Sequence, residues 1–179
     1  MEKYYIYESK VKLSRRFFLF VVIEVLLLIF VIFTFSSEEA YYVRGAIVGI
    51  GALIMLVALW KIFKKIMNRT PVAILESEYI TVINDAKYPV KIALKDVNSI
   101  LPYKIRKQSF LGILIEDDVE EKYIASIPSK GQRMYRINKR TGFAPFNIHT
   151  NLLEIDRETL VAKLEEYHMN VLAPEDEAQ

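Results

Sequence analysis

The chain has 179 residues, 24 Lys and Arg against 22 Asp and Glu, and no cysteine. The absence of cysteine excludes a disulfide framework, a thiolate metal site and a cysteine nucleophile. The formal net charge of +2 hides an asymmetry, because 14 basic and 17 acidic residues lie from Thr70 onward and the positive excess therefore lies in the first 69 residues. A nucleic-acid-binding domain has a basic surface, so we do not expect nucleic acid as a partner.

Two apolar runs, 17–35 and 46–60, lie in the first third of the chain. The first has 19 residues with Glu24 as its one charge. At about 1.5 Å per residue it spans about 28 Å, close to a hydrocarbon core of about 30 Å. The second run reaches spanning length when residues 41–43 are included. We therefore predict a transmembrane hairpin with basic flanks over residues 1–69, with spans at about 17–35 and 41–60.

Charges on either side of the two runs predict the orientation of this hairpin. The loop 36–44 carries Glu38 and Glu39 against Arg44. The outer flanks are basic: Lys3, Lys10, Lys12, Arg15 and Arg16 on one side, and Lys61, Lys64, Lys65 and Arg69 on the other. Because cytoplasmic flanks of membrane spans are enriched in Lys and Arg, we expect a multi-pass protein of the cytoplasmic (inner) membrane with both termini in the cytoplasm.

The chain from residue 70 to 172 is long enough for one cytoplasmic domain, and residues 173–179 read as an acidic disordered tail. Short apolar or alternating runs between turn signals predict strands at 72–76, 79–83, 90–94, 97–105, 110–115, 123–127 and 143–148. Pro102 makes 97–105 an edge or bulged strand, whereas 110–115 reads as a central one.

From Arg157 the apolar residues recur at intervals of three and four, which is typical of an amphipathic helix, and Asp156 is a suitable N-cap. The predicted fold class is thus an α+β membrane protein. Its helical hairpin precedes an antiparallel sheet or partial barrel that a C-terminal helix closes.

Three stretches carry a resemblance to a known family: KKIMNRTPVAILESEYITV after the second span, VKIALKDVNSI, and the closing FAPFNIHTNLLEIDRETLVAKLEEYH. They resemble an uncharacterised bacterial family with two N-terminal transmembrane helices and one cytoplasmic pleckstrin-homology-like (PH-like) domain. The usual Trp of the middle stretch is replaced here by Leu94, which can fill the same core position. The resemblance implies an architecture and no established activity.

Three residues inside the spans are candidates for intramembrane packing or assembly. Glu24 is a carboxylate in an apolar helix, where such residues face a partner or a water path, and Lys61 is its nearest candidate partner. Gly45 and Gly49 have the G-x-x-x-G spacing that lets two helix backbones approach closely. Whether that contact is within the hairpin or between protomers stays open.

Five basic residues fall within eleven positions that contain no acid: Lys130, Arg133, Arg136, Lys139 and Arg140. If this loop or short helix faces the bilayer, it is a candidate contact for anionic lipid headgroups. Nearby Lys104, Arg106 and Lys107 could extend it. The alternative is a solvated segment whose charges neutralise the acids of 116–121, which we read as a hairpin tip.

No catalytic motif occurs in the sequence, and no Ser or Asp motif lies at useful spacing from His149 or His168. The acidic run 116–121 lacks the spacing of a calcium loop. We therefore expect a non-enzymatic protein with no cofactor or metal: a membrane-anchored interaction module that binds a protein partner, anionic lipid headgroups or both. The alternatives are an immunity-type inhibitor of a toxin and an accessory subunit of a membrane complex. A homo-oligomer is also open.

Overall fold

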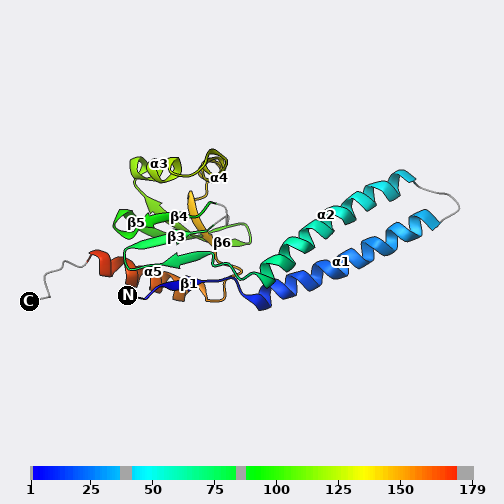
Figure 1. The fold of residues 1–179 in the computed structure, drawn as a ribbon, viewed down its shortest axis with the longest axis horizontal. Coiled ribbons are helices and arrows are strands. Elements are labelled where there is room, and N and C mark those ends of the chain that lie inside the picture. Colours follow the sequence, from blue (N-terminus) through cyan, green and yellow to red (C-terminus); the bar gives the residue numbers. More distant parts are fainter. Residues whose placement is uncertain (1, 37–41, 84–87, 173–179) are drawn as a thin grey trace, which may run out of the picture. The chain divides into compact units, whose positions relative to one another are not determined.

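The computed structural model describes residues 2–36, 42–83 and 88–172 (Figure 1). Its contacts divide the chain into two units. One is the helical unit Lys10–Arg69, and the other, here called the sheet unit, joins the N-terminal residues up to Ser9 to the chain from Thr70 onward. The predicted tail 173–179, the loop acids Glu38 and Glu39 and the first residue of the second predicted span lie outside the described residues.

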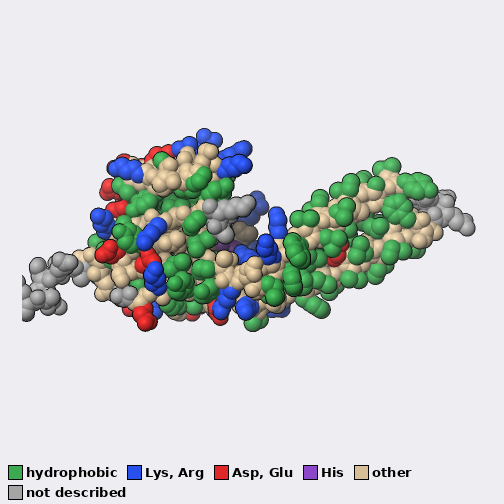
Figure 2. Space-filling view, in the orientation of Figure 1, with side chains coloured by type: hydrophobic (Ala, Val, Ile, Leu, Met, Phe, Trp, Pro, Cys, Tyr) green, Lys and Arg blue, Asp and Glu red, His purple; other side chains and the backbone are tan. Residues whose placement is uncertain are grey.

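The helical unit consists of α1 (Lys10–Ser36) and α2 (Tyr42–Met67). Both helices are long and apolar enough to cross a membrane, which agrees with the two predicted spans. Each helix extends past its predicted span at the basic end. Most of the apolar side chains of the two helices are exposed, so that hydrophobic atoms dominate the surface of this unit beyond its basic end (Figure 2).

The two helices pack along a seam with alternating spacings of three and four residues. The inward positions are Phe17, Phe20, Glu24, Leu27, Val31 and Thr34 on α1, and Gly45, Val48, Ala52, Met55, Leu59 and Ile62 on α2. This spacing is typical of coiled-coil packing and of many membrane helix pairs. The rings of Phe17 and Phe63 lie 6.1 Å apart at one end of the seam, and Phe35 lies against Gly45 at the other.

The sheet unit contains two antiparallel sheets. The first has the order β1-β2-β3-β4, formed by Tyr4–Ile6, Ala73–Leu75, Tyr79–Val82 and Val90–Ala93. The second has the order β5-β6-β7, formed by Val97–Ile105, Gln108–Ile115 and Phe146–His149. A 3₁₀ turn, η1 (Leu94–Asp96), links them. In the described residues the two sheets do not close into a barrel. As predicted, β5 is an edge strand with an irregularity near Val97, and β6 is central.

Strand β1 was not predicted, although it completes the first sheet. It pairs with β2 in the register Tyr4↔Leu75 and Ile6↔Ala73. The Val72 N–H also donates to the Ile6 carbonyl at 2.8 Å. The strand before the helical hairpin and the strand after it are therefore hydrogen-bonded neighbours.

Three helices complete the sheet unit: α3 (Asp117–Ala125), α4 (Ser129–Arg140) and α5 (Arg157–Leu172). The strand predicted at 123–127 is wrong, because most of it forms the last turn of α3. The acids of 116–121 are likewise not a hairpin tip but the start of that helix. Negative side chains there stabilise the helix through their interaction with its dipole. The predicted closing helix is confirmed as α5, and Asp156 accepts the Thr159 N–H as its cap at 2.8 Å.

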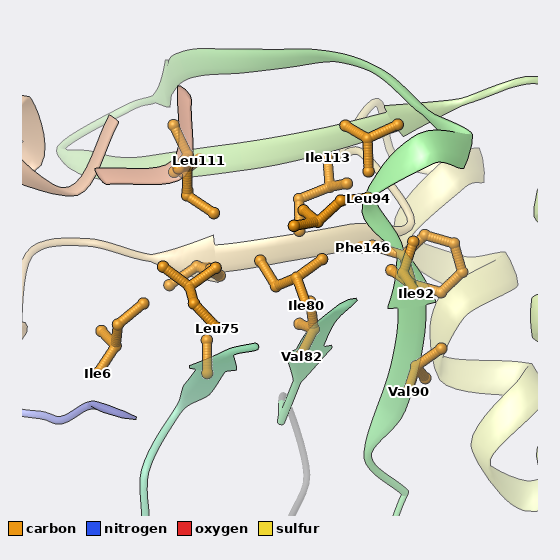
Figure 3. Close-up of a cluster of buried hydrophobic side chains, with 14 of the residues drawn as sticks. Ile6, Leu75, Ile80, Val82, Val90, Ile92, Leu94, Leu111, Ile113 and Phe146 are labelled. Atoms are coloured by element: carbon orange, nitrogen blue, oxygen red, sulfur yellow. The ribbon is translucent and has the colours of Figure 1, made fainter. Parts of the chain in front are cut away.

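The core lies between the two sheets and α5. Figure 3 shows Ile6, Leu75, Ile80 and Ile92 of the first sheet pointing toward Leu111, Ile113 and Phe146 of the second. Leu94 is also buried there, which agrees with the core position predicted for it. From α5, Leu160, Leu164 and Tyr167 close the cluster, and the Tyr167 hydroxyl donates to the Glu2 carbonyl at 2.6 Å.

An ion-pair network also holds the N-terminal segment, in addition to the packing of Ile6 of β1 in the apolar core. The two carboxylate oxygens of Glu76 lie 2.7 Å from the Nζ atoms of Lys3 and Lys91. Hydrogen bonds from these two lysines lower the pKa of Glu76 from 4.5 to about 2. The carboxylate thus links the residue ahead of β1 to β4.

We expect Ile6→Ala to destabilise the sheet unit by about 2–5 kcal/mol, because Ile6 is 1% exposed and its removal leaves a cavity in the core. The measurement is thermal unfolding of the full-length protein in detergent, followed by circular dichroism in the strand region. Tyr5→Ala is the matched control, since Tyr5 on the same strand is 45% exposed. Equal melting temperatures for the two variants would show that β1 is not held in the core.

Because the pKa of Glu76 is lowered in the folded protein, the contribution of this carboxylate to the free energy of unfolding depends on pH. The stabilisation is complete above pH 4.5, the ordinary value, and is lost as the pH falls toward about 2. Urea unfolding should therefore show Glu76→Gln to be less stable than the unmodified protein at neutral pH, with the difference vanishing in acid. A difference that stays constant across this range would contradict the ion pairs with Lys3 and Lys91.

Candidate functional site

The five basic residues of the predicted lipid contact all lie on α4. Tyr135 fixes the orientation of this helix, because it is fully buried and its ring lies 5.3 Å from that of Phe146. Its hydroxyl donates to the Tyr88 carbonyl at 3.0 Å. Gly131 lies against the Tyr88 ring so closely that a Cβ atom there would come within 2.9 Å of it. One face of α4 is therefore fixed against the sheets, and the basic residues lie on the rest of its circumference.

Two of the five are paired with acids of α3. Arg136 lies 2.5 Å from Glu121, and both side chains are more than half exposed. Lys139 lies 2.7 Å from Asp117 and from Glu120, whose side chain is only 6% exposed. Hydrogen bonds to Asp117 and Glu120 raise the pKa of Lys139 well above its usual value. The alternative interpretation, neutralisation of the acidic run, thus holds for Arg136 and Lys139.

The other three, Lys130, Arg133 and Arg140, form a separate face. Together with Ile137 they occupy positions separated by three, four and three residues, which lie along one side of an α-helix. All four are exposed, and Ile137 is exposed by 47%. No ion pair joins these three cations to any acid in the described part of the chain. We call Lys130, Arg133, Ile137 and Arg140 the free face of α4.

The remaining basic candidates, Lys104, Arg106 and Lys107, lie on a different element. They flank or form the turn between β5 and β6, and all three are exposed. A cavity of about 620 Å³ adjoins this turn and is lined by Ile105, Arg106, Lys107, Gln108 and Phe143. Nothing in the local pattern associates Phe143 with this turn, because Phe143 lies 35 positions after Gln108 in the chain.

The intramembrane candidates differ in their surroundings. Glu24 lies on the inward seam of α1 and is 4% exposed, and neither of its carboxylate oxygens has a hydrogen-bond partner within the described residues. Lys61, its predicted partner, is exposed. Gly45 packs inside the hairpin, where a Cβ atom would come within 2.8 Å of the Phe35 ring. Gly49 has no such neighbour within 4 Å, so only the first glycine of the pair is needed for this contact.

A scan against protein-family models and searches of curated proteins and of solved structures found no match to this chain.

The division of α4 into paired and free cations can be tested by one substitution at two positions. Lys139→Met leaves the buried Glu120 carboxylate without its partner, and we expect a loss of about 1–3 kcal/mol in the free energy of unfolding. Lys130→Met is the matched control and should change stability little. Urea unfolding of the full-length protein in detergent measures both. Equal losses would show that the described pairing with α3 does not form.

Proposed function

We propose that this chain is a membrane-anchored module in which the helical hairpin holds the sheet unit at the cytoplasmic face of the inner membrane. There the free face of α4 contacts anionic lipid headgroups. The two helices, each long and apolar enough to cross a membrane, support the anchoring. We further propose that the sheet unit is a PH-like domain. Its support is the order of four strands, three strands and a C-terminal helix that packs on η1 and β5.

The pairing of β1 with β2 supports the proposal that both ends of the hairpin lie on the same side of the membrane. Three residues separate β1 from α1, and five separate α2 from β2. A hydrogen-bonded sheet with an apolar core cannot be divided by a bilayer, because its polar backbone groups would be left unsatisfied in lipid. The start of α1 and the end of α2 therefore lie on one side of the membrane. The basic residues at those ends, Lys10 to Arg16 and Lys61 to Arg69, favour the cytoplasm.

The free face of α4 is the observation that carries the lipid contact. Its three cations lie beside one exposed isoleucine, and clusters of Lys and Arg on a helix attract anionic lipid headgroups. Each cation near an anionic surface contributes about 1 kcal/mol, so that three give about 3 kcal/mol. Such a contact is weak for a free protein. Tethering by the hairpin raises the local concentration of lipid, and a weak contact is then largely occupied.

The absence of cysteine allows this contact to be tested with a single reporter. Ile137→Cys carries a polarity-sensitive fluorophore, and the full-length protein is placed in nanodiscs of phosphatidylcholine alone or mixed with phosphatidylglycerol. We expect a blue-shifted emission only in the anionic discs. The shift should decrease at high salt, which screens the attraction, and when Lys130, Arg133 and Arg140 are replaced by Ala.

Glu165→Cys on the exposed side of α5 is the matched reporter. Its emission should be the same in both kinds of disc. Emission from the Ile137→Cys reporter that does not respond to phosphatidylglycerol, even at low salt, would refute the lipid contact at α4.

A further inference from the structure

The turn between β5 and β6 has a backbone conformation that its residues do not favour. Ile105 and Gln108 form the last pair of the two strands, which leaves Arg106 and Lys107 as the turn. Arg106 has φ = 56°, and in the described part of the chain it is the one residue other than glycine with a positive φ. Such positions favour Gly or Asn, so an arginine here adopts a conformation that costs free energy.

Asn151 holds this turn in place. Its Oδ1 accepts the Ser109 N–H at 2.8 Å, and its Nδ2 donates to the Lys107 carbonyl at 3.0 Å. The Thr150 N–H donates to the Ser109 carbonyl at 2.9 Å. The backbone that carries the two cations is thus fixed by the neighbouring segment.

That segment also binds the chain where it leaves the sheet unit toward α1. The Ser9 N–H donates to the Leu152 carbonyl at 2.7 Å, and the Glu154 N–H donates to the Tyr7 carbonyl at 3.0 Å. Ser9 directly precedes α1. The turn therefore lies at the end of the sheet unit from which the chain continues into an apolar helix.

The cavity beside the turn has the chemistry of an anion site with an apolar side. Arg106 and Lys107 supply charged donors, Gln108 supplies an amide, and Ile105 and Phe143 line the rest; none of the lining residues that the structure describes is acidic. The Phe143 ring packs edge-on against that of Phe110, with centroids 5.1 Å apart. Guanidinium and ammonium groups are the usual donors to phosphate oxygens.

We propose that this cavity binds the phosphate of an anionic phospholipid headgroup, through Arg106 and Lys107, with the glycerol carbons against Phe143. The inference rests on the proposed function, because it requires the sheet unit to meet an anionic bilayer. It differs from the contact at α4 in kind. The free face of α4 responds to surface charge, whereas the cavity at the turn holds a single headgroup. Free phosphate shares this chemistry, so the test must separate the two sources.

Native mass spectrometry of the full-length protein in neutral detergent measures the headgroup contact directly. The protein is titrated with phosphatidylglycerol, with phosphatidylcholine or with inorganic phosphate, and the fraction that retains one added molecule is recorded. We expect a larger fraction of the protein to retain phosphatidylglycerol than to retain phosphatidylcholine or inorganic phosphate. Arg106→Gly combined with Lys107→Gln should weaken it about tenfold, the equivalent of one hydrogen bond to a charged group.

Arg106→Gly separates binding from folding. Glycine adopts a positive φ without strain, so this change should leave the melting temperature equal or higher while retention falls. Unchanged retention in the double variant would refute the site at the turn, as would equal retention of phosphatidylcholine. Equal retention of inorganic phosphate would assign the cavity to free phosphate and overturn the lipid assignment.

The variant with Lys130, Arg133 and Arg140 replaced by Ala distinguishes this proposal from the proposed function. It should keep its retention in detergent while its fluorescence response in anionic nanodiscs is lost. If the nanodisc response is present and retention does not depend on Arg106, the turn proposal fails and the contact at α4 stands. If both are absent, the proposed function fails as well.

Discussion

The hydrogen-bonded pair of β1 and β2 is the constraint on which the rest of the structure depends. It joins two segments that the whole hairpin separates in sequence, and it places Ile6 in the core between the sheets. The connections from this pair to α1 and α2 are only three and five residues long. The hairpin is in effect a long insertion in the connection between two neighbouring strands. A fragment that starts at Thr70 would lack this edge strand and its core residue.

Elements with a strong local pattern could be predicted, and those that depend on distant partners could not. The apolar runs predicted both long helices. The alternation around Lys91 predicted β4, where Val90 and Ile92 are buried and Lys91 is exposed. Strand β1 has three residues, too few for any periodicity, and exists because β2 lies beside it. The run 123–127 is equally consistent with a helix or a strand when taken alone. The acids at the start of α3 decide in favour of the helix through the dipole and through ion pairs with α4.

The candidate site shows the same limit. Composition alone located the basic segment, but its division into paired and free cations depends on the helical phase of α4 and on the acids of α3. Arg136 and Lys139 pair with acids of α3, while Lys130, Arg133 and Arg140 form no ion pair within the described residues. The exposed Ile137 could have been found from its spacing to these three. The cavity at the β5–β6 turn could not, because Phe143 reaches it only through the folding of the second sheet.

The position of β1 also sets an order of events during synthesis. Residues 4–6 leave the ribosome before the two apolar helices, yet their partner strand follows only after both helices have emerged. Until residues 73–75 are made, the hydrogen-bonding groups of this strand have water as their partner. The sheet can close only once the end of α2 has returned to the start of α1, since pairing at this sequence separation carries a loop-closure cost. Completion of the first sheet thus depends on the hairpin, and a chain in which the end of α2 does not return to the start of α1 would keep an open sheet edge.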